Sequence, residues 1–308
     1  MRIDSTPSSD RTFLPLDAAT ARDPHAPYAV LPLPYERTVS YGRGTADGPG
    51  AILDASQQVE DFDEEFQEPL GLRVQTLRAP PFADLPDPEA LELIGRTAGH
   101  VLARRRFLLS LGGEHTVTAP LVAAAHAVHG SLSVLHIDAH ADLRSEYRGT
   151  ALSHACVMRH VREMGVRTVS VGVRSLSAAE HDYAQSERVP IFWAADIAAA
   201  KDESWIEEAI ALLEEPVYIT FDIDGLDPSL VPGTGTPEPG GLTWRQATRL
   251  LRAVCEARRV IGADIVELSP LPAAVASEFV AARLATKILL YHKHGRRAKH
   301  KADPKEGK

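Results

Sequence analysis

Short apolar runs alternate along this chain with longer segments in which apolar positions recur at helical spacing. Such continuous apolar runs, separated by helices, are typical of a parallel sheet covered by helices on both faces. We therefore expect an α/β fold, a single three-layer α/β/α domain with a mainly parallel sheet. The predicted strands are 28–33, 107–111, 132–137, 167–173, 217–221 and 260–266. The predicted helices are 51–62, 88–105, 118–129, 203–214, 244–257 and 277–290.

Both ends of the chain depart from this pattern. Residues 1–26 are polar and rich in proline, which predicts a flexible arm. Residues 293–308 carry seven Lys or Arg, two acids and almost no apolar side chain, so we expect a disordered basic tail. No repeat or linker divides the remainder, which predicts one domain over 27–292. Within it, residues 60–68 hold six acids, and we interpret this run as a solvated acidic surface.

The charge and composition exclude several classes of protein. A net charge of -9 over 308 residues argues against a nucleic-acid-binding protein, because phosphate binding needs a basic field. Cys156 and Cys255 are too few for a disulfide framework and indicate reduced thiols. The N-terminus lacks an apolar signal region, and no apolar run approaches the roughly 20 residues of a membrane span. We therefore expect a cytoplasmic protein with no membrane partner.

Acidic and histidine side chains follow four of the predicted strands. In open parallel sheets the ligand site lies beyond the carboxyl ends of the strands, so side chains at these ends should share one rim. Residues two apart in extended backbone point to the same side, which brings the members of Asp-x-His-x-Asp and Asp-x-Asp together. The side chains on this rim are His115, Asp138, His140, Asp142, Asp222, Asp224 and Glu267.

Such a cluster of carboxylates needs positive charge to be stable. Repulsion in a partly buried site would cost many kcal/mol, and two divalent ions would relieve it. Carboxylates with a minority of imidazole suit Mn(II), with Ni(II), Co(II), Fe(II) and Zn(II) as alternatives. Two neighbouring ions commonly bind a bridging water of lowered pKa, whose hydroxide attacks an electrophilic carbon. The reaction then needs a proton donor, and His154 follows Asp142 closely enough to reach the rim.

Several motifs make this interpretation specific. GGEH, HIDAHADLR, SHACVMRH, TFDIDGLDPSLVPGTGTPEPGGLT and DIVELSP resemble those of the ureohydrolases, the arginase and agmatinase family. The likeness runs from about Tyr28 to His292 and is greatest for the agmatinase branch. It implies an arginase-like single α/β domain that holds two Mn(II) ions, assembled as a homotrimer or homohexamer.

The resemblance also implies a role for each residue on the rim. Asp138 and Asp222 would bridge both ions, and a bridging hydroxide would attack the guanidinium carbon to give urea and an amine. His154 would be the proton shuttle, and Glu267 would hold the guanidinium. The remaining ligands would be His115 and Asp142 for one ion, and His140 and Asp224 for the other.

The sequence says less about the tail of the substrate, the part beyond its guanidinium group. Arginases have an Asn where this chain has Arg144. The charge of Arg144 favours a tail with a carboxylate over a tail with a bare amine, unless Glu146 or another acid pairs with Arg144. The overall motifs favour agmatine, giving putrescine and urea, with N1-aminopropylagmatine, guanidinobutyrate and arginine as alternatives. A non-catalytic family member and a binuclear phosphoesterase are two further alternatives. The phosphoesterase would need an Asn–His pair, and the chain contains no Asn. His136, two residues before Asp138, is a candidate to contact the metal ligands.

Overall fold

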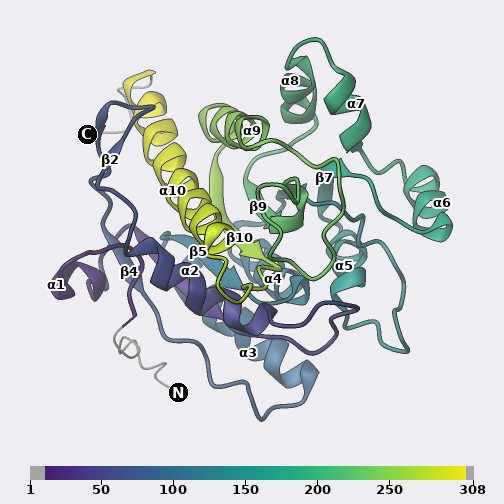
Figure 1. Ribbon diagram of the computed structural model, residues 1–308, viewed down its shortest axis with the longest axis horizontal. Coiled ribbons are helices and arrows are strands. Elements are labelled where there is room, and N and C mark those ends of the chain that lie inside the picture. Colours follow the sequence, from purple (N-terminus) through teal and green to yellow (C-terminus); the bar gives the residue numbers. More distant parts are fainter. Residues whose placement is uncertain (1–10, 303–308) are drawn as a thin grey trace.

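A sheet of eight parallel strands forms the centre of the protein (Figure 1). The computed structural model describes residues 11–302, and it describes side chains up to residue 295. Most strand residues are buried, as expected for strands covered on both faces. Across the sheet the order is β4 (Val74–Thr76), β1 (Tyr28–Leu33), β5 (Phe107–Gly112), β10 (Val260–Val266), β9 (Val217–Asp222), β6 (Ser133–Ile137), β7 (Arg167–Val173) and β8 (Ile191–Trp193).

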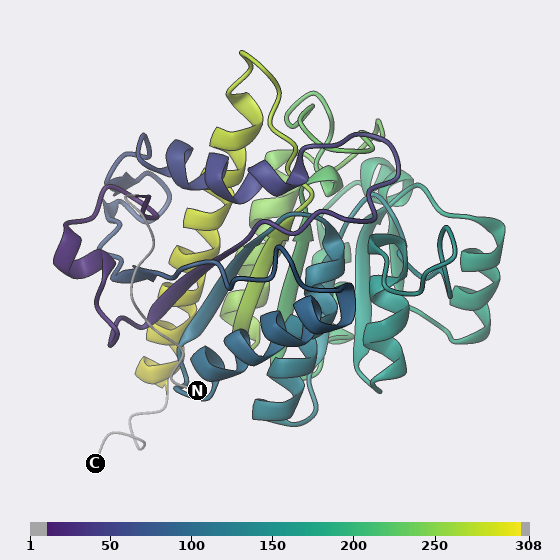
Figure 2. The ribbon, with the colours of Figure 1, turned by 90° about the horizontal axis from the view of Figure 1, so that it is seen from below.

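Helices cover both faces of this sheet and bury a separate apolar cluster against each (Figure 2). The resulting three layers confirm the predicted α/β/α architecture. One face carries α2 (Gly48–Ser56), α7 (Ala194–Ala199), α8 (Ser204–Ala211), α9 (Trp244–Ala257) and α10 (Ala276–Ala302). The other face carries α3 (Asp87–Leu102), α4 (Thr118–His129), α5 (Val157–Glu163) and α6 (Ala178–Ser186).

The sequence located the long elements well and missed the short ones. All six predicted strands are present. The predicted helix at 51–62 instead spans Gly48–Ser56, and it begins earlier than expected because Pro49 suits the first turn of a helix. The missed elements are the edge strands β4 and β8, the helices α1 (Ala18–Ala21), α5, α6 and α7, and a hairpin of β2 (Phe62–Asp63) with β3 (Glu68–Pro69).

The expected N-terminal arm is packed wherever the structure describes it. Phe13 and Leu14 are buried, and their backbone N–H groups donate to Thr76 Oγ1 at 2.8 Å and Ser56 Oγ at 2.9 Å. Apolar contact with the core and these two hydrogen bonds hold the segment against β4 and α2. The expectation of a flexible arm is therefore wrong for residues 11–26, and residues 1–10 lie outside the described range.

The C-terminal segment is also more ordered than its composition suggested. Helix α10 continues to Ala302, so the predicted disorder is wrong for residues 293–302. Lys293 Nζ donates to Leu70 O at 2.7 Å and to Glu68 Oε1 at 3.2 Å, and the ring of His294 stacks on Phe66 at 3.6 Å. Lys293 and His294, the first basic residues of the segment, are therefore held against the protein by specific contacts. Residues 303–308 lie outside the described range.

The acidic run at 60–68 is not simply a solvated surface. Asp63 is fully buried, and it accepts a hydrogen bond at 2.8 Å from Lys287 Nζ, whose side chain is only 2% exposed. Lys287 also lies 3.2 Å from Glu64 and 3.1 Å from Glu65. The acids therefore fasten the β2–β3 hairpin to helix α10.

Candidate metal centre and pocket

The predicted site residues lie together at the carboxyl ends of four adjacent central strands, β5, β10, β9 and β6. Asp138 directly follows β6, Asp222 ends β9, and Glu267 directly follows β10. His115 begins a single 3₁₀ turn after β5. Adjacent parallel strands end on the same rim, so the sheet itself brings these side chains close.

Local backbone geometry supports this arrangement. At Gly113, a Cβ atom would lie 2.2 Å from the carbonyl oxygen of Tyr35, so only glycine allows the segment after β1 to approach the GGEH turn. Asp142 and Glu267 have φ angles of 51° and 64°, in the left-handed region that non-glycine residues rarely adopt. Such strain costs on the order of 1–3 kcal/mol per residue and is commonly concentrated at functional sites.

His115 sits at the centre of the first group of candidate ligands. Its Nδ1 lies 3.2 Å from Asp138 Oδ2, 3.1 Å from Asp142 Oδ2 and 3.3 Å from Asp222 Oδ2. This buried nitrogen has no hydrogen-bond partner within the described residues. One imidazole nitrogen facing three carboxylate oxygens is a donor set that suits a divalent ion.

The contacts on the other side of the His115 ring indicate its tautomer. Thr220 Oγ1 donates to Asp264 at 2.6 Å, so the same oxygen can accept from His115 Nε2 at 2.9 Å. With its proton on Nε2, the ring directs the lone pair of Nδ1 at the carboxylates. A buried carboxylate that orients a histidine in this way is a common support for metal ligands.

The second group contains His140, Asp224 and Asp138. His140 Nδ1 lies 3.1 Å from Asp224 Oδ2 and 3.4 Å from Asp138 Oδ1. Asp138 therefore belongs to both groups, which makes it a natural bridge between two ions. All six predicted ligands meet in this cluster, and their chemistry fits two divalent ions.

The electrostatics of the cluster also favour bound cations. Burial, followed by the charges of Asp224 and Asp138, raises the pKa of Asp222 well above its usual value. Burial lowers the pKa of His115, but three neighbouring carboxylates outweigh burial and raise it overall. Carboxylates so close together cannot all be charged without nearby positive charge.

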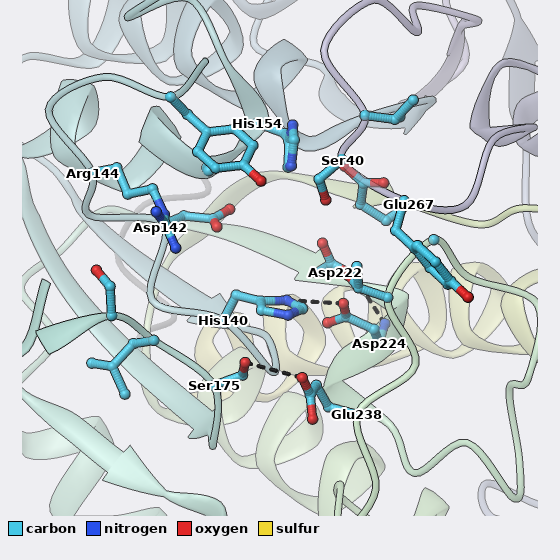
Figure 3. Close-up of a pocket in the computed structure, with 18 of the residues that line it drawn as sticks. Ser40, His140, Asp142, Arg144, His154, Ser175, Asp222, Asp224, Glu238 and Glu267 are labelled. Atoms are coloured by element: carbon cyan, nitrogen blue, oxygen red, sulfur yellow. Dashed lines mark hydrogen bonds and ion pairs between the residues drawn. The ribbon is translucent and has the colours of Figure 1, made fainter. Parts of the chain in front are cut away.

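A cavity of about 300 Å³ opens over this cluster, and both His154 and Glu267 line it. In Figure 3, His154 and Ser40 lie on one side of Asp222, Asp224 and His140, with Glu238 and Ser175 on the opposite side. Burial lowers the pKa of His154, which favours its neutral form as the resting state. Burial and the nearby charge of Glu114 raise the pKa of Glu267, whose Oε1 accepts from the backbone N–H of His115 at 2.7 Å.

Arg144 also lines the cavity, but it is paired. Its Nε lies 3.4 Å from Glu180 Oε2, and its guanidinium lies 4.9 Å from the centre of the Tyr147 ring. Glu180 itself is buried and accepts from Ser177 and from the backbone N–H of Leu143. Glu180, rather than Glu146, is therefore the acid that offsets the charge of Arg144.

Sequence reasoning missed several residues beside the site. Glu114 lies in the motif GGEH, and Glu238 lies in the PGTGTPEPGG part of the longest motif, so their presence in these motifs could have marked them as candidates. Thr38 lies in YERTVSYGRGTADGPGAILDAS, a segment that also resembles the family, whereas Ser175 lies outside every motif and reaches the site only in the folded chain. His136, which the sequence did single out, is buried with its Nε2 2.7 Å from Asp138 Oδ2 and its Nδ1 3.0 Å from Ser170 Oγ.

Among the described helices, none combines the length and apolar character required to span a bilayer. Cys156 and Cys255 are buried and form no disulfide within the described residues, in agreement with the predicted thiols, and burial raises the pKa of Cys156 to about 11.

Comparison with known proteins agrees with this geometry. The sequence model of the arginase family matches residues 26–291 of this chain. An N(1)-aminopropylagmatine ureohydrolase of Synechocystis is 37% identical over 301 residues, covering 95% of this chain and 97% of that protein. A Thermus thermophilus enzyme of the same name is 39% identical, covering 80% and 85%. An agmatinase of Pyrococcus horikoshii is 33% identical, covering 79% and 84%.

A solved structure supports the same assignment. The agmatine ureohydrolase of Thermoplasma volcanium superposes with a TM-score of 0.84 at 27% identity, covering 95% of this chain and 97% of that one. The predicted family is thus confirmed by sequence over most of the chain and by fold over nearly all of it. This chain belongs to the arginase family and is a ureohydrolase, a hydrolase acting on the C–N bonds of guanidino groups.

Proposed function

We propose that two divalent ions, with Mn(II) as the best candidates, bind at the six clustered ligands. His115 and Asp142 would complete one coordination shell, His140 and Asp224 the other, and Asp138 and Asp222 would bridge the two. The close approach of His115 Nδ1 to three carboxylate oxygens supports the first shell. When bound, such a pair supplies a water of lowered pKa as the nucleophile.

The protein then has to orient the guanidinium and deliver a proton. We assign the first task to Glu267, because a carboxylate pairs with a guanidinium through two parallel hydrogen bonds. Glu267 projects into the same cavity as Asp222 and Asp224, which keeps the carbon close to the nucleophile. Addition of water and cleavage of one C–N bond give urea and an amine. His154 would donate the proton that the departing amine needs.

The charges around the cavity support a cationic substrate tail. Besides the metal ligands, the acids Glu180, Glu238 and Glu267 line the cavity. The charge of Arg144 is offset by Glu180, so Arg144 does not present a free cation to a carboxylate-bearing tail. Glu238 is half-buried, and its Oε1 accepts from Ser175 Oγ at 3.0 Å. This carboxylate is therefore our candidate to receive an ammonium group of the tail.

Among cationic substrates, we infer that N1-aminopropylagmatine is preferred and that agmatine is the second candidate. The relatives named for aminopropylagmatine are 37% and 39% identical, against 33% for the agmatinase compared above. The sequence motifs alone favoured agmatine, which is shorter by one aminopropyl unit and carries one positive charge fewer in its tail. Guanidinobutyrate and arginine bear a carboxylate, which suits this acidic cavity poorly.

The test is urea release by the Mn(II)-loaded protein from aminopropylagmatine, agmatine, guanidinobutyrate and arginine. We expect kcat/KM to be highest for aminopropylagmatine and second highest for agmatine. For the two carboxylate-bearing substrates, guanidinobutyrate and arginine, kcat/KM should be at least tenfold lower than for agmatine. A preference for either carboxylate would refute the assignment of the tail. Release of no urea from any of the four would refute the proposed reaction and favour the non-catalytic alternative.

We also propose that the protein is a cytoplasmic homotrimer or homohexamer. Light scattering after size-exclusion chromatography would test the assembly, and a monomer of 33.4 kDa would contradict it.

A further inference from the structure

Thr38 lies in the segment after β1 and contacts the ring of His154 from outside the metal cluster. We propose that Thr38 is a positioning residue that fixes which ring nitrogen of His154 exchanges a proton with the substrate. The inference rests on the proposed function, because it concerns the residue assigned there as proton donor.

A single hydroxyl group makes three contacts at this point. Thr38 Oγ1 donates to Glu114 Oε1 at 2.8 Å and lies 3.0 Å from His154 Nδ1. The same oxygen accepts from the backbone N–H of His154 at 3.1 Å. Thr38 therefore holds both the ring and the backbone of His154, although the two residues are 116 positions apart in the sequence.

The surroundings of Glu114 determine the direction of these hydrogen bonds. Glu114 is fully buried, and its Oε2 accepts from the backbone N–H groups of Arg37 at 2.7 Å and Thr38 at 2.6 Å. Its Oε1 accepts from the hydroxyls of Thr38 and of Thr116, the latter at 2.6 Å. Two backbone N–H groups and two hydroxyl groups thus donate to Glu114, and its carboxylate accepts all four hydrogen bonds.

Proton counting then assigns the tautomer of His154. The Thr38 hydroxyl has one hydrogen, and Glu114 receives it, so Oγ1 can only accept from the ring. The neutral ring of His154 must therefore carry its hydrogen on Nδ1. Its Nε2 is left as the nitrogen that takes up and releases a proton. Histidine tautomers are set in this way by the hydrogen bond made at the opposite nitrogen.

A second hydroxyl near the ring provides a matched control. Ser153 Oγ lies 3.5 Å from His154 Nδ1, at the limit of a hydrogen bond. If any nearby hydroxyl could orient the ring, removal of Ser153 Oγ would matter as much as removal of Thr38 Oγ1. The shorter contact and the link to Glu114 single out Thr38.

The test compares Thr38→Val, which keeps the shape and removes the hydroxyl, with Thr38→Ser, which keeps the hydroxyl. We expect Thr38→Val to lower kcat by about tenfold to 10²-fold, within the range of lost acid–base catalysis, with KM changed less than threefold. Thr38→Ser and the control Ser153→Ala should stay within about threefold of the wild type. Circular dichroism and the bound-metal content should be the same in all variants.

The decisive measurement is the tautomer itself. Histidine labelled with ¹⁵N in the full-length protein, loaded with diamagnetic Zn(II), reports the protonated nitrogen, and His154→Ala identifies the signal. We expect an Nδ1–H ring in the wild type and in Thr38→Ser, and a mixed or reversed tautomer in Thr38→Val. An unchanged tautomer in Thr38→Val, or equal losses of kcat in Thr38→Val and Thr38→Ser, would overturn the proposal. Absence of urea release by the wild type would refute the proposed function, whereas the spectra would still decide the role of Thr38.

Discussion

Replacing Lys287 by methionine removes the buried cation that joins helix α10 to the β2–β3 hairpin. Methionine has a similar length, so packing is largely retained while the charge is lost. Asp63 would then stay fully buried without its cation, keeping only the backbone N–H groups of Glu65 and Phe66 as donors. Removing one partner of a buried ion pair costs about 3–5 kcal/mol. Glu64 adds little to this cost because its side chain is 69% exposed.

The pH dependence gives a second signature of the same pair. Burial alone would raise the pKa of Asp63, but the hydrogen bond from Lys287 and the backbone N–H groups outweigh burial and lower it. A lowered folded-state pKa stabilises the protein above the unfolded value of about 3.9, and this stabilisation is lost as the pH falls through the folded value. Lys287→Met removes the hydrogen bond and the charge that lower the pKa of Asp63, so this pKa should rise relative to the wild type. The deficit of the variant should therefore be complete at pH 7 and shrink in acid, where Asp63 is neutral.

Urea denaturation of the metal-loaded protein at pH 7 measures this cost. Arg283→Met on the same helix is the control, because its partner Glu64 is exposed, and we expect a loss of less than about 1 kcal/mol. The double variant Lys287→Met/Asp63→Leu should recover most of the loss, since it leaves no buried charge. If Lys287→Met lies within 1 kcal/mol of the wild type, or if the double variant is no more stable than the single one, the reasoning is refuted.

Three further predictions concern the site. Mn(II) at 100 times its Kd should stabilise the wild type by about 2.7 kcal/mol per site relative to the EDTA-treated protein, and Asp138→Ala should lose both this effect and the bound metal measured by elemental analysis. His154→Ala should retain its metal and lose about 10²-fold in kcat, and a loss of less than threefold would rule out the shuttle role. Glu238→Gln should raise KM for aminopropylagmatine about tenfold, because a charge-assisted hydrogen bond contributes about 1.5–3 kcal/mol, and an unchanged KM would remove Glu238 from tail recognition.

The side chains on the rim of the sheet could be predicted from sequence because each lies at or shortly after the end of a strand along the chain. Asp138, Asp222 and Glu267 each stand where an apolar run stops, and parallel strands bring such positions to one edge. His154 was a candidate only because it follows Asp142 closely in the sequence, since no predicted strand or helix carries it, and the family resemblance then implied its role as proton shuttle.

Contacts between distant segments could not be predicted in this way. The acids at 60–68 looked solvated because their cation, Lys287, is more than 220 positions away. Residues 293–302 looked disordered for the same reason, since composition does not reveal that Lys293 meets Glu68 and Leu70. The contact between Thr38, Glu114 and His154 likewise exists only after three separate segments have been brought together.

The position of β10 in the sheet has a consequence for how the protein is made. This strand, at Val260–Val266, lies between β5 and β9, so it joins the half of the sheet that carries His115 to the half that carries the five aspartate and histidine ligands from β6 and β9. Without β10, no described strand would join β5 to β9, so we expect the candidate ligands of the two halves to stay apart in a partly synthesised chain. The proposed metal site would therefore be assembled only after β10 has joined the sheet, and a chain that lacks β10 should not bind the metal.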